Sequence, residues 1–376
     1  MKRNPRSRRF RKSAHRNDDE VSDDHPHPRI SSSHSPRRSH GSKIPRAIKV
    51  PTPPITENNK SNKIETDVSS IIVMAPSIIT ESEILATGLN YVGFPFKSQA
   101  KTGETIKLIR FTSFFGVEPP AIYALFQDLR EKHPHVIFQY VFMALNWLKL
   151  YETRPVMAGR WGFCEEHIAP KVKEYIELIQ SLFNQTISFD KFHKDEVYIV
   201  SVDAVHFVTN EFRKDPSTSW FDFKNNGAGL TYEFSVALRH QNIVSVYGPK
   251  PAATPDITMF RGGNVDVSVH ERDQTALYFK IPEGKYAVGD SGYRGEPSKI
   301  VCVEDGHDDE FKEFISRAKN RQESLHSRIC GFHVLSHCFR HGTSSANRME
   351  YHQTCVHAVC VIVQYDMTHG HPLMEI

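Results

Sequence analysis

Residues 196–206 read EVYIVSVDAVH, a run of apolar and mostly β-branched side chains with one acid, Asp203, inside it. Such a run predicts a β-strand, and it marks the place where a helical pattern gives way to a strand-forming one. Burying a carboxylate in an apolar strand costs free energy unless the group is paired or binds a metal ion. Asp203 is therefore a candidate site residue, and a structural boundary is expected near residue 190.

The chain after this run alternates strand and helix patterns. The predicted strands are 230–239 and 242–247, joined as a hairpin, and 285–288, and the predicted helices lie at about 256–260, 308–340 and 350–365. Strands followed by helices, then a strand and more helices, predict an α/β domain with a mixed sheet flanked by helices. We assign this domain to residues 191–376.

A second acid, Asp290, directly follows the strand predicted at 285–288 and has Gly289 and Gly292 beside it. Ligands of open α/β sheets bind at the carboxyl ends of strands, and glycines allow a close approach. Two such acids and a third from a helix would hold two divalent ions, which activate water for attack on a phosphodiester. A lone Asp more commonly makes a turn, and the residues alone leave both interpretations open.

Residues 67–190 predict helices. Apolar residues recur at helical spacing in 121–132, 136–151 and 164–182, and residues 158–162 (AGRWG) are expected to form a connection. Three short helices with a glycine-containing turn fit a helix-turn-helix DNA-binding region, although a plain helical bundle gives the same pattern. The basic residues best placed to contact phosphates are Arg160, Lys171 and Lys173.

Residues 1–66 predict a disordered basic tail, because they are rich in Arg, Ser, Pro and His and almost lack aromatic residues. Residues 1–50 hold 14 Lys and Arg against 5 Asp and Glu, whereas the remaining residues hold 33 against 39. A nuclear import signal or an arm that holds DNA is expected, with an unused solvated tail as the alternative. The seven residues of this basic run are Lys2, Arg3, Arg6, Arg8, Arg9, Arg11 and Lys12.

The six cysteines show no Cys-x-x-Cys spacing, so a disulfide framework is not expected and a reducing compartment fits. The basic N-terminus lacks the apolar segment of a secretory signal. The most apolar run, residues 356–363, is too short to cross a bilayer. We expect a soluble intracellular protein without a membrane partner.

From about residue 191 to the end, the chain resembles the nuclease domain of Harbinger-type transposases, a family of DDE-superfamily endonucleases. The stretch 111–185 resembles the region that precedes this domain in the family, but more loosely. Seven ordered blocks carry the resemblance: VDAVHF (202–207), KNNGAGLTYEFSVAL (224–238), GPKPAATPDITMFRGG (248–263), PEGKYAVGDSGYRGEP (282–297), RAKNRQESLHSRICGF (317–332), FRHG (339–342) and AVCVIVQYDMTHGHPLMEI (358–376).

The resemblance implies a ribonuclease-H-like fold and a DNA endonuclease that cuts and joins phosphodiester bonds at transposon ends. The family pattern implies that Asp203, Asp290 and Glu323 are the catalytic acids and hold two Mg²⁺ or Mn²⁺ ions. Asp256 lies in a motif that is usually acidic, and we expect it to shape the site without binding metal. Double-stranded DNA, a nuclear location and a Myb-like accessory protein are also implied, and a homo-oligomer is left open.

Two departures from the family pattern concern the segment that carries Glu323. Cys330 stands where the family often has a basic residue that grips the DNA end, and Arg328 and Arg321 are the nearby candidates for DNA contact. On a straight helix, Glu323 also points about 150° away from the apolar stripe of this segment. Either the helix breaks near Asn320 or Glu323 is a surface acid, so its catalytic role rests on the resemblance.

Two other interpretations are kept. His333, His337, Cys338, His341, His352 and Cys355 have spacings that can bind zinc, but short motifs of this kind often arise by chance. The chain is alternatively a transposon-derived DNA-binding protein that has lost cleavage, which the presence of Cys330 favours mildly.

Overall fold

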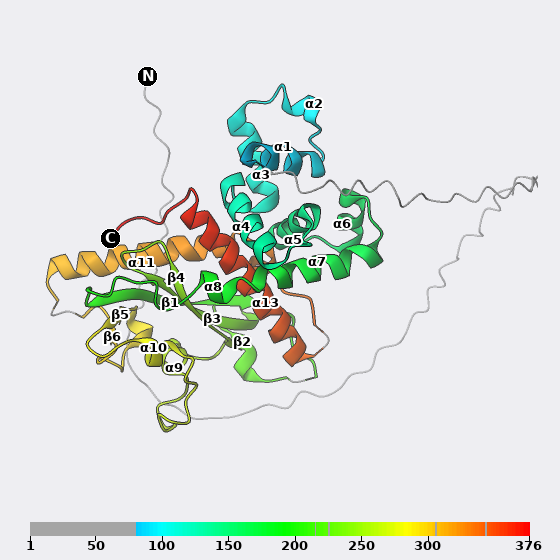
Figure 1. Cartoon of the computed structure of the whole chain (residues 1–376). Helices are drawn as coiled ribbons and strands as arrows, with labels where there is room; N and C mark the ends of the chain where they lie inside the picture. Colours follow the sequence, from blue (N-terminus) through cyan, green and yellow to red (C-terminus); the bar gives the residue numbers. More distant parts are fainter. Residues whose placement is uncertain (1–79, 215, 225, 305–306, 343) are drawn as a thin grey trace, which may run out of the picture. The chain divides into compact units, whose positions relative to one another are not determined.

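The computed structural model describes residues 80–376 except 215, 225, 305–306 and 343. The predicted basic tail, from Lys2 to residue 66, lies outside these residues and stays a prediction. The whole of the described chain falls in one compact unit. In this unit a helical region comes first and a sheet with its own helices follows (Figure 1).

Eight helices make up the first region. They are α1 (Glu81–Tyr91), α2 (Phe96–Gln99), α3 (Glu104–Phe115), α4 (Pro119–Lys132), α5 (Phe138–Leu150), α6 (Arg154–Trp161), α7 (Glu165–Gln180) and α8 (Phe183–Thr186). Helix α5 is buried on all sides over residues 141–148, as expected of a central helix. The helices predicted at 121–132, 136–151 and 164–182 are confirmed as α4, α5 and α7.

The prediction of a connection at residues 158–162 is wrong. These residues form the end of α6, which continues through Gly159 and stops at Gly162. Gly162 has a φ of 70°, and its backbone N–H bonds to the carbonyl of Ala158. A glycine in this left-handed conformation commonly ends a helix, so the second glycine of AGRWG is the terminator and the first is an ordinary helical residue.

The sheet is mixed. Its strands are β1 (Tyr198–Val208), β2 (Phe221–Asp222), β3 (Gly227–Ala237), β4 (Ile243–Pro251), β5 (Tyr286–Val288) and β6 (Ile300–Val301). The strand order is β2-β3-β1-β5-β6, and β4 also pairs with β3. β1 is antiparallel to β3 and parallel to β5, and β5 is parallel to β6. The predicted strands and the α/β class are confirmed, whereas the short strands β2 and β6 were not predicted.

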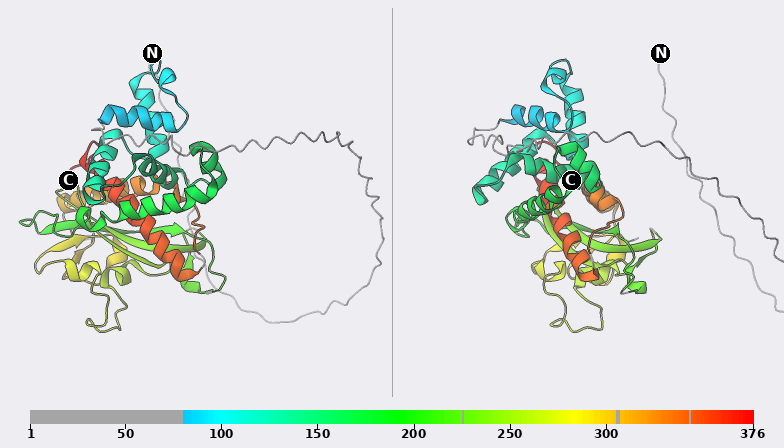
Figure 2. Two further views of the ribbon diagram at one scale, coloured as in Figure 1. Left: turned by 45° about the vertical axis from the view of Figure 1, so that its right-hand side comes forward. Right: turned by 90° about the vertical axis from the view of Figure 1, so that its right-hand side faces the viewer.

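Helices cover both faces of this sheet (Figures 1 and 2). Val202 of β1 packs with residues of α9 (Asp256–Arg261) and α10 (Leu277–Lys280). Ser201 and Phe207 face the other way and contact α11 (Asp309–Cys330) and α13 (Ser345–Thr368). Alternate side chains of a strand point to opposite faces, so Asp203 shares the face of Ser201 and Phe207.

The long helix predicted at 308–340 is shorter than expected. α11 ends at Cys330, and the four-residue helix α12 (His333–Ser336) follows after a break at Gly331 and Phe332. The chain then runs back to the sheet, where Phe339 forms an isolated bridge with Thr209 just after β1. No helix in the described part of the chain meets the length and apolarity that a membrane crossing requires.

One hydrophobic core joins the two regions on either side of residue 190. It contains Leu145 of α5, Ile176 of α7, Phe234 of β3 and Ile362 of α13. α13 packs against α4 and α7 as well as against β4. The change from helices to strands near residue 190 is therefore a change of secondary structure within a continuous core.

Candidate functional site

The register of the sheet places Asp203 beside Asp290. β1 and β5 are parallel, and Ser201 of β1 lies opposite Val288, the last residue of β5. Two residues further along each chain come Asp203 and Asp290. Asp203 Oδ1 accepts a hydrogen bond from its neighbour's amide, Ala204 N, at 2.8 Å, and Asp290 Oδ1 accepts one from Gly292 N at 2.7 Å. Asp203, in the middle of β1, therefore lies beside Asp290, which follows the carboxyl end of β5.

Asp256 belongs to the same cluster. It is the first residue of α9, and its carboxylate approaches the turn that follows Asp290. A Cβ atom on Gly292 would lie 2.5 Å from Asp256 Oδ2 and 3.0 Å from Asp290 Oδ1. Because real Cβ atoms do not come this close, only glycine at position 292 lets the two carboxylates lie on either side of the turn.

The acids in this cluster repel one another. The pKa of Asp203 is raised to about 6, mainly by burial, and the charges of Asp290, Asp256 and Glu323 add to the shift. The hydrogen bond from Ala204 opposes it. Burial and the charge of Asp290 also raise the pKa of Asp256. Such a concentration of negative charge favours a bound cation.

Glu323 lies at the rim of the cluster. α11 is unbroken from Asp309 to Cys330, so the helix does not break near Asn320. The side chain of Glu323 is exposed, while Gln322 and His326 on the same helix are buried. Glu323 nevertheless raises the pKa of Asp203, which shows that it lies within electrostatic range of the first acid.

Two buried side chains of α11 that the sequence analysis did not single out, His326 and Gln322, lie near Asp203. His326 Nδ1 lies 3.6 Å from Asp203 Oδ2, and burial lowers the pKa of His326 to about 4. Gln322 Nε2 donates to the carbonyl of Phe234 at 2.9 Å and lies 3.1 Å from His326 Nε2. His326 Nε2 must then accept, which leaves the ring hydrogen on Nδ1 and directed toward Asp203. A neutral His326 therefore lies beside Asp203 Oδ2, beyond hydrogen-bond distance, and does not neutralise the acid.

Glu233 is a further acid that the sequence analysis missed. It lies on β3 opposite Ala204, and it is 1% exposed. Neither carboxylate oxygen has a hydrogen-bond partner among the described residues, and burial, with the charges of Asp256 and Asp203, raises its pKa to about 8. The argument that singled out Asp203, an acid inside an apolar strand, applies equally to the run LTYEFSV (230–236).

The basic residues predicted to bind DNA in the helical region already have acidic partners. Arg160 Nε lies 3.0 Å from Glu152 Oε2 in a bidentate pair. Lys171 pairs with Glu174 at 2.8 Å, and Lys173 lies 3.6 Å from Glu177. The two lysine pairs are partly exposed, so a phosphate can compete for these lysines more readily than for Arg160.

The expectation that Arg321 contacts DNA does not fit its placement. Arg321 is 1% exposed, and its guanidinium donates to the carbonyls of Met374 and His240. Arg328 donates to Pro372 at 3.2 Å and lies 3.5 Å from Asp366. Both arginines therefore hold the C-terminal segment against the sheet region, although Arg328 keeps an exposed part. Cys330 is half-buried, and burial raises the pKa of its thiol.

The His and Cys residues whose spacing could bind zinc do not gather at one place. His352 is buried and its Nδ1 bonds to the Tyr232 hydroxyl at 2.8 Å, whereas His341 packs against Trp147. Within the described ranges, no three His, Cys, Asp or Glu side chains are placed to hold a metal ion. This also holds for the acidic cluster. Its carboxylates influence one another's pKa values, but as they are placed no three of them surround a common point.

Comparisons of the chain with protein-family models, with curated proteins and with solved structures found no match.

Proposed function

We propose that the protein is a metal-dependent DNA endonuclease of the Harbinger transposase type. The observation that carries the proposal is that Asp203, inside β1, lies beside Asp290, just after the parallel strand β5, with Asp256 and Glu323 in electrostatic range. These are the positions at which the family resemblance places catalytic acids. The mixed sheet, with β1 at its middle and helices on both faces, supports a ribonuclease-H-like fold.

The donor atoms fit Mg²⁺ or Mn²⁺, because both ions prefer carboxylate oxygens. Burial first, and then the charges of neighbouring carboxylates, raise the pKa values of Asp203 and Asp256, and a bound cation would offset those charges. Asp203 and Asp290 would hold the metal, and Glu323 would complete the second position by turning inward from the rim. When bound, a pair of such ions supplies an activated water and stabilises the leaving oxygen of a phosphodiester.

The chain's own residues fix where this chemistry takes place. Asp203 is held by the amide of Ala204 on one oxygen and faces the His326 ring with the other. The amide of Gly292 holds Asp290 in the turn after β5. Asp256 approaches from α9 and adds negative charge without a hydrogen bond to either acid. This support fixes the first two carboxylates in orientation, which is what catalysis by positioning requires.

The remaining expectations belong to the same proposal. The substrate is duplex DNA, the protein acts in the nucleus, and a Myb-like accessory protein assists recognition of the DNA ends. Lys171, which is partly exposed, and Lys173, which is exposed, are the residues of the helical region that we expect to contact phosphates. Joining of the cut ends to a target follows from the same acids, since a freed 3′-hydroxyl can take the place of water.

A cleavage assay tests the proposal directly. The full-length protein is incubated with supercoiled plasmid and with a linear duplex in Mg²⁺, in Mn²⁺ and in EDTA, and nicked and linear products are separated on gels. We expect products with either metal and none in EDTA. DNA binding without a product at any Mn²⁺ concentration would replace this function with that of a DNA-binding protein that has lost cleavage.

Gly292→Ala tests whether the acids must lie this close together. The added Cβ would displace Asp256 or Asp290, and a displacement of about 1 Å is expected to lower the cleavage rate about a hundredfold. Mn²⁺ affinity, measured by calorimetry, should weaken in parallel. Gly103→Ala is the matched control, because Gly103 has no neighbour within 4 Å of the new atom. Equal effects of the two substitutions would contradict the assignment.

A further inference from the structure

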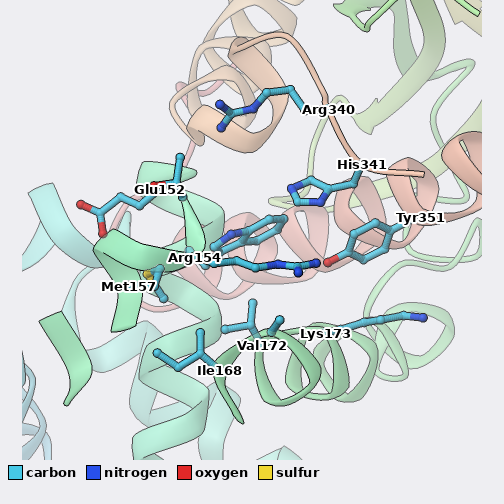
Figure 3. Close-up of a pocket in the computed structure, with 12 residues that line it drawn as sticks. Glu152, Arg154, Met157, Ile168, Val172, Lys173, Arg340, His341 and Tyr351 are labelled. Atoms are coloured by element: carbon cyan, nitrogen blue, oxygen red, sulfur yellow. The ribbon is translucent and has the colours of Figure 1, made fainter. Parts of the chain in front are cut away.

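A cavity of about 280 Å³ lies outside the acidic cluster, between α6, α7 and the start of α13. Its apolar walls are formed by Trp147, Met157, Ile168 and Val172. Figure 3 shows Arg154 reaching across the cavity toward Tyr351 and His341. A pocket of this kind, mostly apolar with a few charged groups, is typical of small-molecule sites.

The charges around the cavity are unbalanced. Arg154, Lys173 and Arg340 line it, but Lys173 pairs with Glu177, and the one carboxylate in the lining, Glu152, is already bound by Arg160. In the described ranges, no carboxylate pairs with Arg154 or Arg340, and the Arg340 guanidinium donates only to the carbonyl of Tyr151 at 3.2 Å. The Arg340 guanidinium also lies over the Tyr151 ring and points away from Arg154 (Figure 3). Arg154, which reaches across the cavity without an acidic partner, is therefore the residue placed to bind an oxyanion through paired N–H groups.

The remaining walls favour a flat, apolar group attached to that anion. The rings of Trp147 and Tyr351 lie 6.4 Å apart at an angle of 24°, and the His341 ring meets Trp147 edge-on at 5.3 Å. A bare phosphate would leave these aromatic surfaces unused. Nucleic-acid bases stack on such side chains with little sequence preference.

We propose that this cavity binds a nucleotide, with its phosphate held by Arg154 and its base against Trp147 and Tyr351. The proposal does not depend on the carboxylates or on cleavage. It concerns a nucleotide, whether free in solution or unpaired within a DNA strand, and the experiment distinguishes these two sources.

The cavity is too far from the acids to hold the reacting phosphate. Phe339, which directly precedes Arg340, bridges Thr209, six residues beyond Asp203 along β1. At about 3.3 Å per residue this places Thr209 about 20 Å from Asp203. With about 3.4 Å between successive nucleotides of a strand, a bound DNA would reach the cavity about six nucleotides from the acids.

Calorimetric titration of the full-length protein in EDTA tests the proposal, with deoxyadenosine 5′-monophosphate, inorganic phosphate and deoxyadenosine as probes. We expect the nucleotide to bind at least about tenfold more tightly than either of its parts. Arg154→Ala should weaken nucleotide binding about tenfold, and Arg130→Ala, a matched arginine outside the cavity, less than about twofold. Asp203→Asn should leave nucleotide binding unchanged, so the result of this titration does not depend on whether the protein cleaves DNA.

A six-nucleotide single strand distinguishes the two sources. Tighter binding of the strand than of the mononucleotide indicates DNA, and weaker binding indicates a free nucleotide. Should Arg154→Ala fail to fold, Arg154→Lys, which keeps the charge but loses the paired N–H groups, is expected to show an intermediate loss. Phosphate binding as tight as nucleotide binding, tighter binding of a phosphotyrosine peptide, or full binding by the Arg154 variant would overturn the proposal.

Discussion

Asp203→Asn is expected to lower metal-dependent DNA cleavage about a thousandfold or more, because it removes a charge that the metal ions require. The substitution keeps the shape of the side chain. It also relieves the repulsion from Asp290 and Asp256 that, together with burial, raises the pKa of Asp203 to about 6. The melting temperature should therefore not fall while activity is lost. The rate of plasmid nicking and thermal unfolding of the same preparation measure the two effects.

The matched control is Asp266→Asn, which removes the charge of an exposed aspartate. We expect this variant to cleave DNA at the rate of the unmodified protein. A loss of cleavage that accompanies a large drop in melting temperature would mean that Asp203 is structural. Cleavage that survives Asp203→Asn would mean that the acids do not carry the chemistry.

Glu233→Gln is expected to change how the stability of the protein depends on pH. The folded pKa of Glu233 is about 8, well above its ordinary value of 4.5. Below about pH 4.5 the carboxyl group is protonated in both the folded and the unfolded chain, so the folded state carries no penalty. As the pH rises to about 8, the unfolded chain releases the proton first, and the free energy of unfolding falls. Above about pH 8 the loss is complete.

The glutamine variant lacks this titration and should be more stable than the unmodified protein above pH 8. A shift of this size corresponds to at most about 5 kcal/mol, and we expect about 2 kcal/mol because the buried site relaxes and the Lys280 ammonium stays nearby. At pH 5 the two proteins should have nearly equal free energies of unfolding. Asp256, Asp203, Lys280 and Tyr293 are the other titratable groups that affect Glu233, and all four remain in the variant.

Urea unfolding at pH 5 and at pH 8.5 measures this effect. Glu283→Gln, at an exposed position, is the control and should leave the pH dependence unchanged. Parallel pH profiles for the Glu233 variant and the unmodified protein would show that Glu233 ionises normally in the folded state.

Much of the sheet could be predicted from the sequence because its strands are short apolar runs bounded by turn residues. The same patterns placed Asp203 inside one strand and Asp290 directly after another, and the register between β1 and β5 brings them side by side. The end of α11 could not be predicted in this way, since residues 331–340 continue the apolar spacing of the helix before them. Their true conformation depends on contacts with β1 that are distant in sequence.

The supporting residues of the site were harder to find. His326 lies on the apolar stripe of α11, where a histidine is usually a core residue, and only the tertiary structure shows that it faces Asp203. Gly292 was expected to allow a ligand to approach closely, but the structure shows that the group beside it is the carboxylate of Asp256, from another part of the chain. For Arg321 the sequence suggested an accessible basic residue that contacts DNA, whereas the side chain is buried in the structure.

The contacts of α13 have a consequence for how the protein is made. α4 and α7 leave the ribosome early, but the helix that covers them ends only at Thr368. At about 5–20 residues per second, translation of the residues between α7 and the end of α13 takes about 10–40 s. During that time the exposed apolar faces of α4 and α7 are open to chaperones, so this nascent chain is expected to depend on them until its last helix is synthesised.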